Sequence, residues 1–427
     1  MYSIATALSC LQRQLSDDFP APSGPRYLET SFPLNDSFDP LGWLSAQHHY
    51  PQFYWQQRNG DEELAALGCV QKFSSLALAQ QFLREHSHLQ DLRICGLNAF
   101  DPDSGALFLP RLEWRRTGSA ARLRLYVLNN DDARRAQDFL NSLRPPALLD
   151  KLNLTLASER HHPERSGWQA LMSQALEAIA QGALDKVVLA RASDYTFAQP
   201  VNAAALMAAS RRLNHHCFHF YMAFDGDNAF LGSTPERLWR RRGLALRTEA
   251  LAGTVANDPC DARAGALAGW LMTDDKNQRE NMLVVEDICQ RLQAGVALMD
   301  VLPPQVVRLR KVQHLRRCIW TELRAADDEA CLKQLQPTAA VAGLPRDKAR
   351  DFLQRHEPFA REWYAGSAGY LSLQQSEFCV ALRSAKVTRN VVRLYAGAGI
   401  VRGSDAEQEW QEIENKAAGL RSLLLMD

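Results

Sequence analysis

The segment SDAEQEWQEIENKAAGLRSLL, residues 404–424, predicts a helix of about five turns. Ser404 and Asp405 are residue types that cap a helix by accepting hydrogen bonds from its free N–H groups. Glu409, Glu412 and Lys416 follow at spacings of three and four, which places two carboxylates and an amine on one face. Two carboxylates and an amine on one face could hold a metal ion and an anionic ligand side by side. The commoner alternative is a solvated helix with ordinary surface charges.

The segment before this helix, VVRLYAGAGIVRG (residues 391–403), is rich in β-formers and then in glycine. We expect a strand followed by a flexible turn of bare backbone next to the charged face. A second small-residue turn is expected at LAGT, residues 251–254, where backbone can approach a ligand closely.

Composition narrows the class of protein. The chain has 427 residues with 49 basic and 49 acidic side chains, and this balance gives no reason to expect a nucleic-acid or membrane partner. The N-terminus lacks a secretory signal pattern, and no apolar run is long enough to span a bilayer. The nine cysteines are scattered without a Cys-x-x-Cys pair. We therefore expect a cytoplasmic protein with reduced thiols and neither a zinc site nor disulfides.

Residues 1–155 show no catalytic spacing. Their short aromatic and β-branched segments, bounded by turn formers, predict a meander of strands. A polar stretch at residues 158–167 predicts an exposed connection within the part that carries the candidate chemistry, residues 156–427. Because no long flexible linker separates the two parts, we expect the N-terminal region to be integrated with the catalytic body.

Two charged residues stand at the ends of predicted strands. Lys186 directly precedes the apolar run VVLA, and Glu236 follows Pro235 after a predicted hairpin with an Asp-Gly turn. Such a lysine is usually a surface charge, and such a glutamate usually pairs with an arginine. The functional alternative is an enclosed site, where desolvation favours a neutral amine that acts as a base and a protonated carboxyl that acts as an acid.

A second strong helix is predicted over residues 274–293, with Glu280, Val284 and Asp287 on one stripe. We expect a further helix near residues 319–335 and a single strand at EFCVALRSAKV, residues 377–387. Several antiparallel strands with helices laid outside them indicate an α+β fold.

Eight motifs occur in order between residues 184 and 417. They are LDKVVLAR, STPERLW, TEALAGT, RENMLVVEDI, QPTAAVAGLPR, FCVALRSAKV, YAGAGIV and EWQEIENKA. The set resembles the chorismate-utilising enzymes that share the anthranilate synthase component I catalytic fold, and it is most similar to isochorismate synthases of the menaquinone pathway. WQQRNGDEE and LNAFDP extend the resemblance into the N-terminal third. It implies large antiparallel β-sheets in a sandwich-like core with helices packed outside.

The resemblance also implies a Mg²⁺ site. Two helix-borne glutamates of this family hold the metal, which binds the ring carboxylate of chorismate, and Glu280 and Glu412 match them. Glu409 matches a glutamate that reaches the metal through water. In the family a second residue near the first helix accompanies that glutamate, and Asn277 stands at its position here. This difference puts the water-mediated contact to the metal in doubt. Carboxylate and water ligands suit a hard cation and agree with the absence of Cys and His ligands.

An acid and a base are implied as well. Lys186 matches the residue that activates the attacking water, and Glu236 matches the acid that protonates the departing hydroxyl. The implied reaction converts chorismate to isochorismate, because water adds at ring carbon 2 while the hydroxyl leaves carbon 4. Both groups then need their less common protonation state at neutral pH, which a mostly enclosed site produces.

Other matches surround the substrate. Arg383 matches the arginine that pairs with the enolpyruvyl carboxylate through its planar fork, and Tyr364 matches a tyrosine that helps to hold the same group. His314 matches a pocket histidine to which the resemblance gives no task. The remaining matches are the backbone positions Gly253, Thr254, Gly397 and Gly399 and the amine of Lys416, near the substrate's carboxylates.

Departures from other family members favour water as the nucleophile. Ala252 stands where aminodeoxychorismate synthases carry a lysine, which excludes covalent capture at that position. Members that add ammonia generally lack a lysine equivalent to Lys186 and work with a glutamine amidotransferase. This chain shows no trace of such a domain, so we expect no amidotransferase partner.

Alternatives remain open at this point. Salicylate synthases share Lys186, Glu236 and the metal site but go on to eliminate pyruvate, and siderophore-pathway isochorismate synthases perform the same isomerisation. A chorismate-binding protein without catalysis is the alternative from another class, although every chemical position is filled. Oligomeric state cannot be inferred from the sequence, and a monomer is the default expectation.

Overall fold

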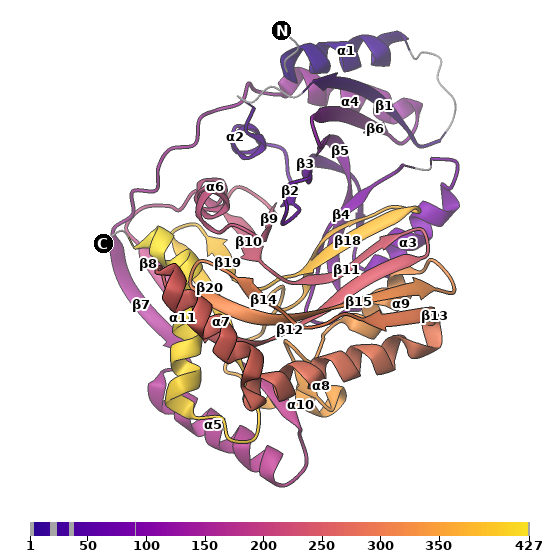
Figure 1. Ribbon diagram of the computed structural model, residues 1–427. Helices are drawn as coiled ribbons and strands as arrows, with labels where there is room; N and C mark the ends of the chain where they lie inside the picture. The colour runs from indigo at the N-terminus through magenta and orange to yellow at the C-terminus, as the bar shows by residue number, and fades with distance from the viewer. Residues whose placement is uncertain (1–3, 18–23, 34–37, 90, 426–427) are drawn as a thin grey trace.

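The computed structural model describes residues 4–17, 24–33, 38–89 and 91–425 (Figure 1). The helices are α1 (Ile4–Asp17), α2 (Pro40–Ser45), α3 (Leu76–Glu85), α4 (Asn130–Ser142), α5 (Arg165–Ala180), α6 (Ala203–Leu213), α7 (Asp261–Thr273), α8 (Asp275–Leu292), α9 (Asp328–Leu335), α10 (Arg346–His356) and α11 (Ala406–Leu424). The strands are β1 (Arg26–Pro33), β2 (Gln52–Gln56), β3 (Glu62–Phe73), β4 (Ile94–Asn98), β5 (Gly105–Thr117), β6 (Ala120–Val127), β7 (Leu156–His162), β8 (Lys186–Phe197), β9 (Phe218–Ala223), β10 (Asn228–Thr234), β11 (Arg237–Arg242), β12 (Ala245–Ala256), β13 (Val296–Val301), β14 (Gln305–Arg308), β15 (Val312–Leu323), β16 (Gly343–Leu344), β17 (Ser367–Leu371), β18 (Gln375–Val380), β19 (Ser384–Thr388) and β20 (Val391–Ile400).

The strands form one continuous hydrogen-bonded sheet that divides into two branches. The long strand β5 pairs antiparallel with β3, β4 and β6, and the division occurs there. The first branch runs through β3, β2, β9, β10, β19, β20 and β8, with each neighbour antiparallel. The second runs through β4, β17, β18, β11, β12 and β15, also antiparallel.

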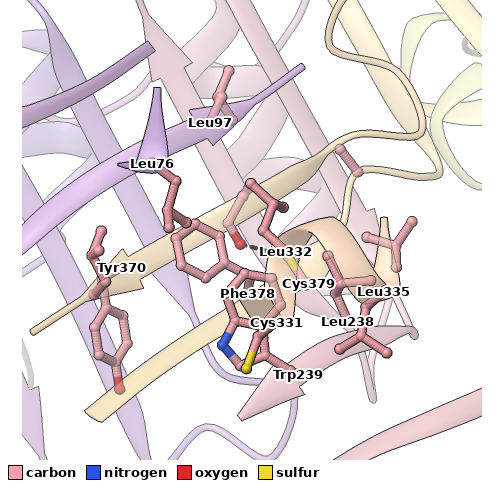
Figure 2. Close-up of a cluster of buried hydrophobic side chains, with 14 of the residues drawn as sticks. Leu76, Leu97, Leu238, Trp239, Cys331, Leu332, Leu335, Tyr370, Phe378 and Cys379 are labelled. Atoms are coloured by element: carbon pink, nitrogen blue, oxygen red, sulfur yellow. Dashed lines mark hydrogen bonds between the residues drawn. The ribbon is translucent and has the colours of Figure 1, made fainter. Parts of the chain in front are cut away.

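The two branches share a hydrophobic core. Trp55 of β2, in the first branch, lies edge-on to Tyr370 of β17, in the second, with ring centroids 5.4 Å apart. Figure 2 shows the second branch, where Leu332 of α9 lies close to Trp239 of β11 and Phe378 of β18. This arrangement confirms the predicted α+β class, with antiparallel sheets in a sandwich-like core and helices outside.

Helices cover the outer faces of the sheet (Figure 1). Helices α1, α2, α4 and α6 share one apolar cluster with the first branch, and α5, α10 and α11 share another with β8 and β20. Helix α8 packs along β12 and β15. No helix in the described part of the chain is both long and apolar enough to cross a membrane.

Strands from the first 155 residues lie inside the same sheet as later strands. Strand β2 pairs with β9, so that Trp55 stands opposite Phe220, and β4 pairs with β17, so that Gly96 stands opposite Gly369. Backbone hydrogen bonds therefore join the N-terminal region directly to the rest of the chain.

The two predicted site helices are present and capped. Asp405 accepts hydrogen bonds from the backbone N–H groups of Glu407 and Gln408 at the start of α11. The Ser404 hydroxyl, expected to share this role, instead accepts from the N–H of Val401 at 3.2 Å. Asp274 caps α8.

Several local predictions are wrong. Within residues 158–167, expected as an exposed connection, residues 158–160 are exposed, but residues 158–162 belong to the strand β7, whose backbone pairs with β8, and residues 165–167 begin α5. Residues 319–323 complete β15, and the following helix begins only at Asp328, capped by Asp327. EFCVALRSAKV is two strands, β18 and β19, separated at Arg383, whose φ is +49°.

Of the two small-residue turns expected, the one at residues 251–254 lies within a strand, and the one in residues 391–403 is confined to Arg402 and Gly403, where Gly403 has a φ of +88°. Strand β20 continues through Gly397 and Gly399 to Ile400, and residues 251–254 belong to β12, which carries an irregularity there. Small residues at these places keep the strand surfaces bare and do not reverse the chain.

Candidate active site

A cavity of ≈ 50 Å³ lies where both sheet branches meet helices α8 and α11. Its lining includes Glu236, Gly253, Thr254, Glu280, His314, Tyr364, Arg383, Gly397, Gly399 and Lys416. A larger cavity of ≈ 440 Å³ shares Thr254, Glu280 and Gly399 with it and also carries Glu409 and Glu412. The structure thus brings together predicted residues from Glu236 to Lys416, and of the predicted residues only Lys186 lines neither cavity.

Lys186 lies directly behind the cavity wall. It begins β8 and has no exposed surface. Its Nζ lies 3.0 Å from Oε1 of Glu280, an ion pair without hydrogen-bond geometry. A buried lysine that faces a cavity-lining carboxylate excludes the surface-charge interpretation.

Glu236 stands between β10 and β11 and is 2% exposed. Its Oε1 has no hydrogen-bond partner among the described residues, so the expected arginine pairing does not hold for this atom. Burial, and after it the charge of Glu249, raises the pKa of Glu236 to about 8 despite the opposing charge of Lys186. The carboxyl therefore keeps its proton at neutral pH, as a general acid requires.

Three glutamates on α8 and α11 face the larger cavity. Their lysine partners, with N–O distances, are Lys186 for Glu280 at 3.0 Å, Lys416 for Glu412 at 2.6 Å and Lys276 for Glu409 at 2.9 Å. Within the described ranges, no three His, Cys, Asp or Glu side chains are grouped as a metal centre. The three carboxylates nonetheless offer an all-oxygen set of ligands, the type that a hard cation prefers.

Three glycines keep the site open. A Cβ on Gly399 would lie 2.3 Å from Oε1 of Glu280, and one on Gly397 would lie 2.8 Å from the Tyr364 hydroxyl. Gly253 has a φ of +90°, a backbone conformation that strains any residue with a side chain. Neighbouring side chains therefore require glycine at positions 397 and 399, and the backbone conformation requires it at position 253.

Arg383 and His314 form a hydrogen-bonded pair inside the cavity. Nη2 of Arg383 donates to Nε2 of His314 at 2.7 Å, and Nδ1 of His314 lies 3.0 Å from the Thr254 hydroxyl. Burial, and then the charges of Arg383 and Lys416, lowers the pKa of His314 well below its ordinary value. A neutral imidazole accepts the guanidinium N–H and fixes its direction.

Tyr364 and Lys416 present donors to the same space. Tyr364 is buried and stacks on Tyr395 with ring centroids 5.0 Å apart, and burial raises the pKa of its hydroxyl to about 12. The hydroxyl therefore stays protonated at neutral pH. Nζ of Lys416 donates to the Gly397 carbonyl at 3.0 Å.

Sequence reasoning missed several residues around the site. Glu249 belongs to the TEALAGT motif, yet nothing in its spacing indicated that it lies next to Glu236. Lys276, one turn before Glu280, was equally unremarked. Oδ1 of Asn277 accepts the Thr254 N–H at 3.0 Å, so this residue supports the backbone of β12.

Comparisons with known proteins agree with this geometry. The sequence matches the family of chorismate binding enzymes over residues 97–425. It is 67% identical to isochorismate synthase MenF of Escherichia coli (strain K12), with 100% of both chains covered.

Solved structures show the same relationship. The structure of MenF, the menaquinone-specific isochorismate synthase from Escherichia coli, matches with a TM-score of 0.97 at 67% identity and covers 99% of this chain and 100% of that one. Anthranilate synthase component I from Streptococcus pneumoniae TIGR4 matches with a TM-score of 0.63 at 19% identity, covering 93% and 92% of the two chains, and thus shares the fold. The chain belongs to the family of chorismate-binding enzymes.

Proposed function

We propose that this chain is an isochorismate synthase, which isomerises chorismate to isochorismate for menaquinone biosynthesis. The 67% identity to the Escherichia coli enzyme over the whole of both chains supports this activity and this pathway. The buried carboxyl of Glu236 is the structural observation that carries it. With a pKa of about 8, this group lines a cavity whose wall also contains Glu280, the partner of the buried Lys186.

The reaction exchanges one hydroxyl for another across the ring. Lys186 takes a proton from a water that attacks ring carbon 2, and Glu236 gives its proton to the hydroxyl that leaves carbon 4 as water. The double bonds shift between these two carbons, so the ring gains and loses equal atoms and charge. Lys186 and Glu236 end in reversed protonation states and must return to their starting states before the next turnover.

We assign a Mg²⁺ site to Glu280 and Glu412, with Glu409 acting through water. Burial, and then the charge of Glu412, raises the pKa of Glu409, and a divalent cation would relieve that repulsion. The oxygen-only ligands and the cavity of ≈ 440 Å³ that they face fit a small cation with its waters. When bound, the metal supplies positive charge for the ring carboxylate of chorismate.

The other polar groups bind the anionic substrate. Arg383 presents its guanidinium fork to the enolpyruvyl carboxylate, and His314 fixes the direction of that fork. The Tyr364 hydroxyl donates to the same group, and Lys416 adds positive charge near the carboxylates. The backbones of Gly253, Thr254, Gly397 and Gly399 lie against the ring.

Several wider properties belong to the same proposal. The pairing of β2 with β9 and of β4 with β17 supports a single body in which residues 1–155 are integrated with residues 156–427. Balanced charge and scattered cysteines support a cytoplasmic enzyme. We further propose that it acts as a monomer, on water rather than ammonia, without a glutamine amidotransferase partner.

Incubation of the purified protein with chorismate and Mg²⁺, followed by chromatography of the products, tests the proposal. Isochorismate as the sole product is expected, and omission of Mg²⁺ should abolish its formation. Salicylate with pyruvate would identify a salicylate synthase. Chorismate recovered unchanged in the presence of Mg²⁺ would leave a binding protein and refute the proposed activity.

A further inference from the structure

One ion pair holds the chain on both sides of Glu236. Nη1 of Arg58 donates to the carbonyl of Pro235 at 2.8 Å, directly before the glutamate. Oε1 of Glu249 accepts from the N–H of Arg237 at 2.9 Å, directly after it. The same Arg58 and Glu249 are joined by two hydrogen bonds, of 2.6 Å and 2.9 Å. Both neighbours of Glu236 are therefore attached to a single rigid unit.

This unit is buried and built from distant parts of the chain. The Glu249 side chain, on β12, has no exposed surface, and that of Arg58, in the turn between β2 and β3, is 16% exposed. The partners lie 191 positions apart. Arg58 also precedes residues 97–425, over which the sequence matches the enzyme family. A residue of the N-terminal region thus contacts the segment around Glu236 in the C-terminal part.

The pair also sets the charge around Glu236. Arg58 is the foremost influence that lowers the pKa of Glu249 against the effect of burial, so Glu249 stays ionised. That anion raises the pKa of Glu236, second only to burial, whereas Lys186, Arg383 and Lys416 oppose it. Glu249 is thus the anion whose charge helps Glu236 to keep its proton near these three cations.

We propose that Arg58 and Glu249 are positioning residues that aim the Glu236 carboxyl at the departing hydroxyl and keep it in its proton-donating form. This role rests on the proposed function, because it assigns the pair to the acid of that reaction. The backbone on both sides of Glu236 must be held rigidly, because Oε1 of Glu236 has no hydrogen bond within the described structure to orient the carboxyl. Misplacement of a reacting group by about 1 Å costs roughly 100-fold in rate.

Glu249→Gln tests both parts of the role. Glu236 acts while protonated, so activity is lost as pH rises through its pKa, and removal of the neighbouring anion lowers that pKa. We expect the basic limb of the kcat profile to move to lower pH by about one unit, and kcat to fall at least tenfold at neutral pH. A folded Glu249→Gln enzyme with kcat and basic limb unchanged would overturn the proposal.

Arg58→Lys separates position from charge. Lysine keeps a cation beside Glu249 but cannot reproduce the fork that reaches Pro235 and both carboxylate oxygens. We expect kcat to fall while the basic limb stays at its wild-type pH. If Glu249→Gln does not fold, Arg58→Lys tests the positioning role by itself. A kcat of Arg58→Lys within twofold of wild type would refute that role.

A matched ion pair supplies the control. Arg111 of β5 donates two hydrogen bonds to Asp132 of α4, of 2.7 Å and 2.6 Å. Both side chains are 9% exposed and lie outside the cavities described above. Asp132→Asn should lower thermal stability and leave both kcat and the pH profile unchanged. A shift of its basic limb equal to that of Glu249→Gln would show that any broken buried pair has this effect and would overturn the proposal.

Failure of the proposed function is recognised separately, as a wild-type protein that does not convert chorismate. The inference is then decided on unliganded protein by infrared titration of the Glu236 carboxyl, assigned by subtraction of the Glu236→Gln spectrum. We expect the carboxyl to titrate at lower pH in Glu249→Gln than in wild type. Identical titrations would refute the role of the pair.

Discussion

Addition of one methyl group to the site, as Gly399→Ala, should disable the enzyme without unfolding it. The new Cβ would lie 2.3 Å from Oε1 of Glu280 and 3.0 Å from Cε of Lys186. The carboxylate must retreat by roughly 1 Å to restore ordinary contact, and a misplacement of that size costs about 100-fold in rate. Overpacking of this kind costs about 1–3 kcal/mol of folding free energy, which a protein of this size tolerates.

Steady-state kinetics over a Mg²⁺ titration provide the assay. We expect kcat/KM to fall about 100-fold and the Mg²⁺ requirement to rise, because the displaced carboxylate is one of the proposed ligands. Gly265→Ala is the matched control, since Gly265 lies on α7 and a Cβ there meets no atom within 4 Å. It should leave kinetics unchanged. If Gly399→Ala retains kcat/KM within twofold of wild type, Glu280 does not act from the position described.

Other substitutions test the remaining roles. Lys186→Ala should remove turnover while calorimetry still detects Mg²⁺-dependent chorismate binding, and retention of most activity would contradict its role as base. Glu236→Gln should be inactive but up to about 4 kcal/mol more stable than wild type near pH 8 in denaturant titrations. The reason is that an acid whose pKa rises from 4.5 to about 8 on folding destabilises the native state increasingly as pH rises between those values. Equal unfolding midpoints of the two proteins at pH 8 would refute this. Arg383→Lys should raise KM for chorismate at least about tenfold with a smaller change in kcat, since lysine lacks the fork that His314 directs; an unchanged KM would argue against the carboxylate contact.

Periodicity placed Glu409 and Glu412, which face the larger cavity, on one face of a helix from sequence alone. The spacings of Glu409, Glu412 and Lys416 placed them on one face of a helix, and that face does line a cavity. Local signals were sufficient here because a helix fixes the relative positions of residues three and four apart. The caps at Asp274 and Asp405 were equally local and likewise present.

Burial was the property that local patterns could not supply. Lys186 looks like a surface charge before an apolar strand, and it is enclosed because β16 pairs with it, β20 pairs with the next residue and Glu280 of α8 lies against its amine. Arg383 looks like an ordinary strand residue. Its φ of +49° nevertheless interrupts the strand, and its side chain forms a hydrogen bond with His314 in the site. Both features are caused by neighbours that are distant in sequence, and rules based on local residue spacing do not predict such contacts.

The chemistry also explains why both sheet branches are needed around one small cavity. Lys186, Gly397 and Gly399 come from β8 and β20 of the first branch, whereas Gly253 and His314 come from β12 and β15 of the second. A buried lysine and a buried arginine are each costly, whereas burial favours the protonated form of Glu236. They persist together because Glu280 lies beside the amine of Lys186 and His314 accepts a hydrogen bond from Arg383. Separation of the branches would hydrate Glu236 and lower its pKa, and on the proposed mechanism the acid would then lose its proton before it met the substrate.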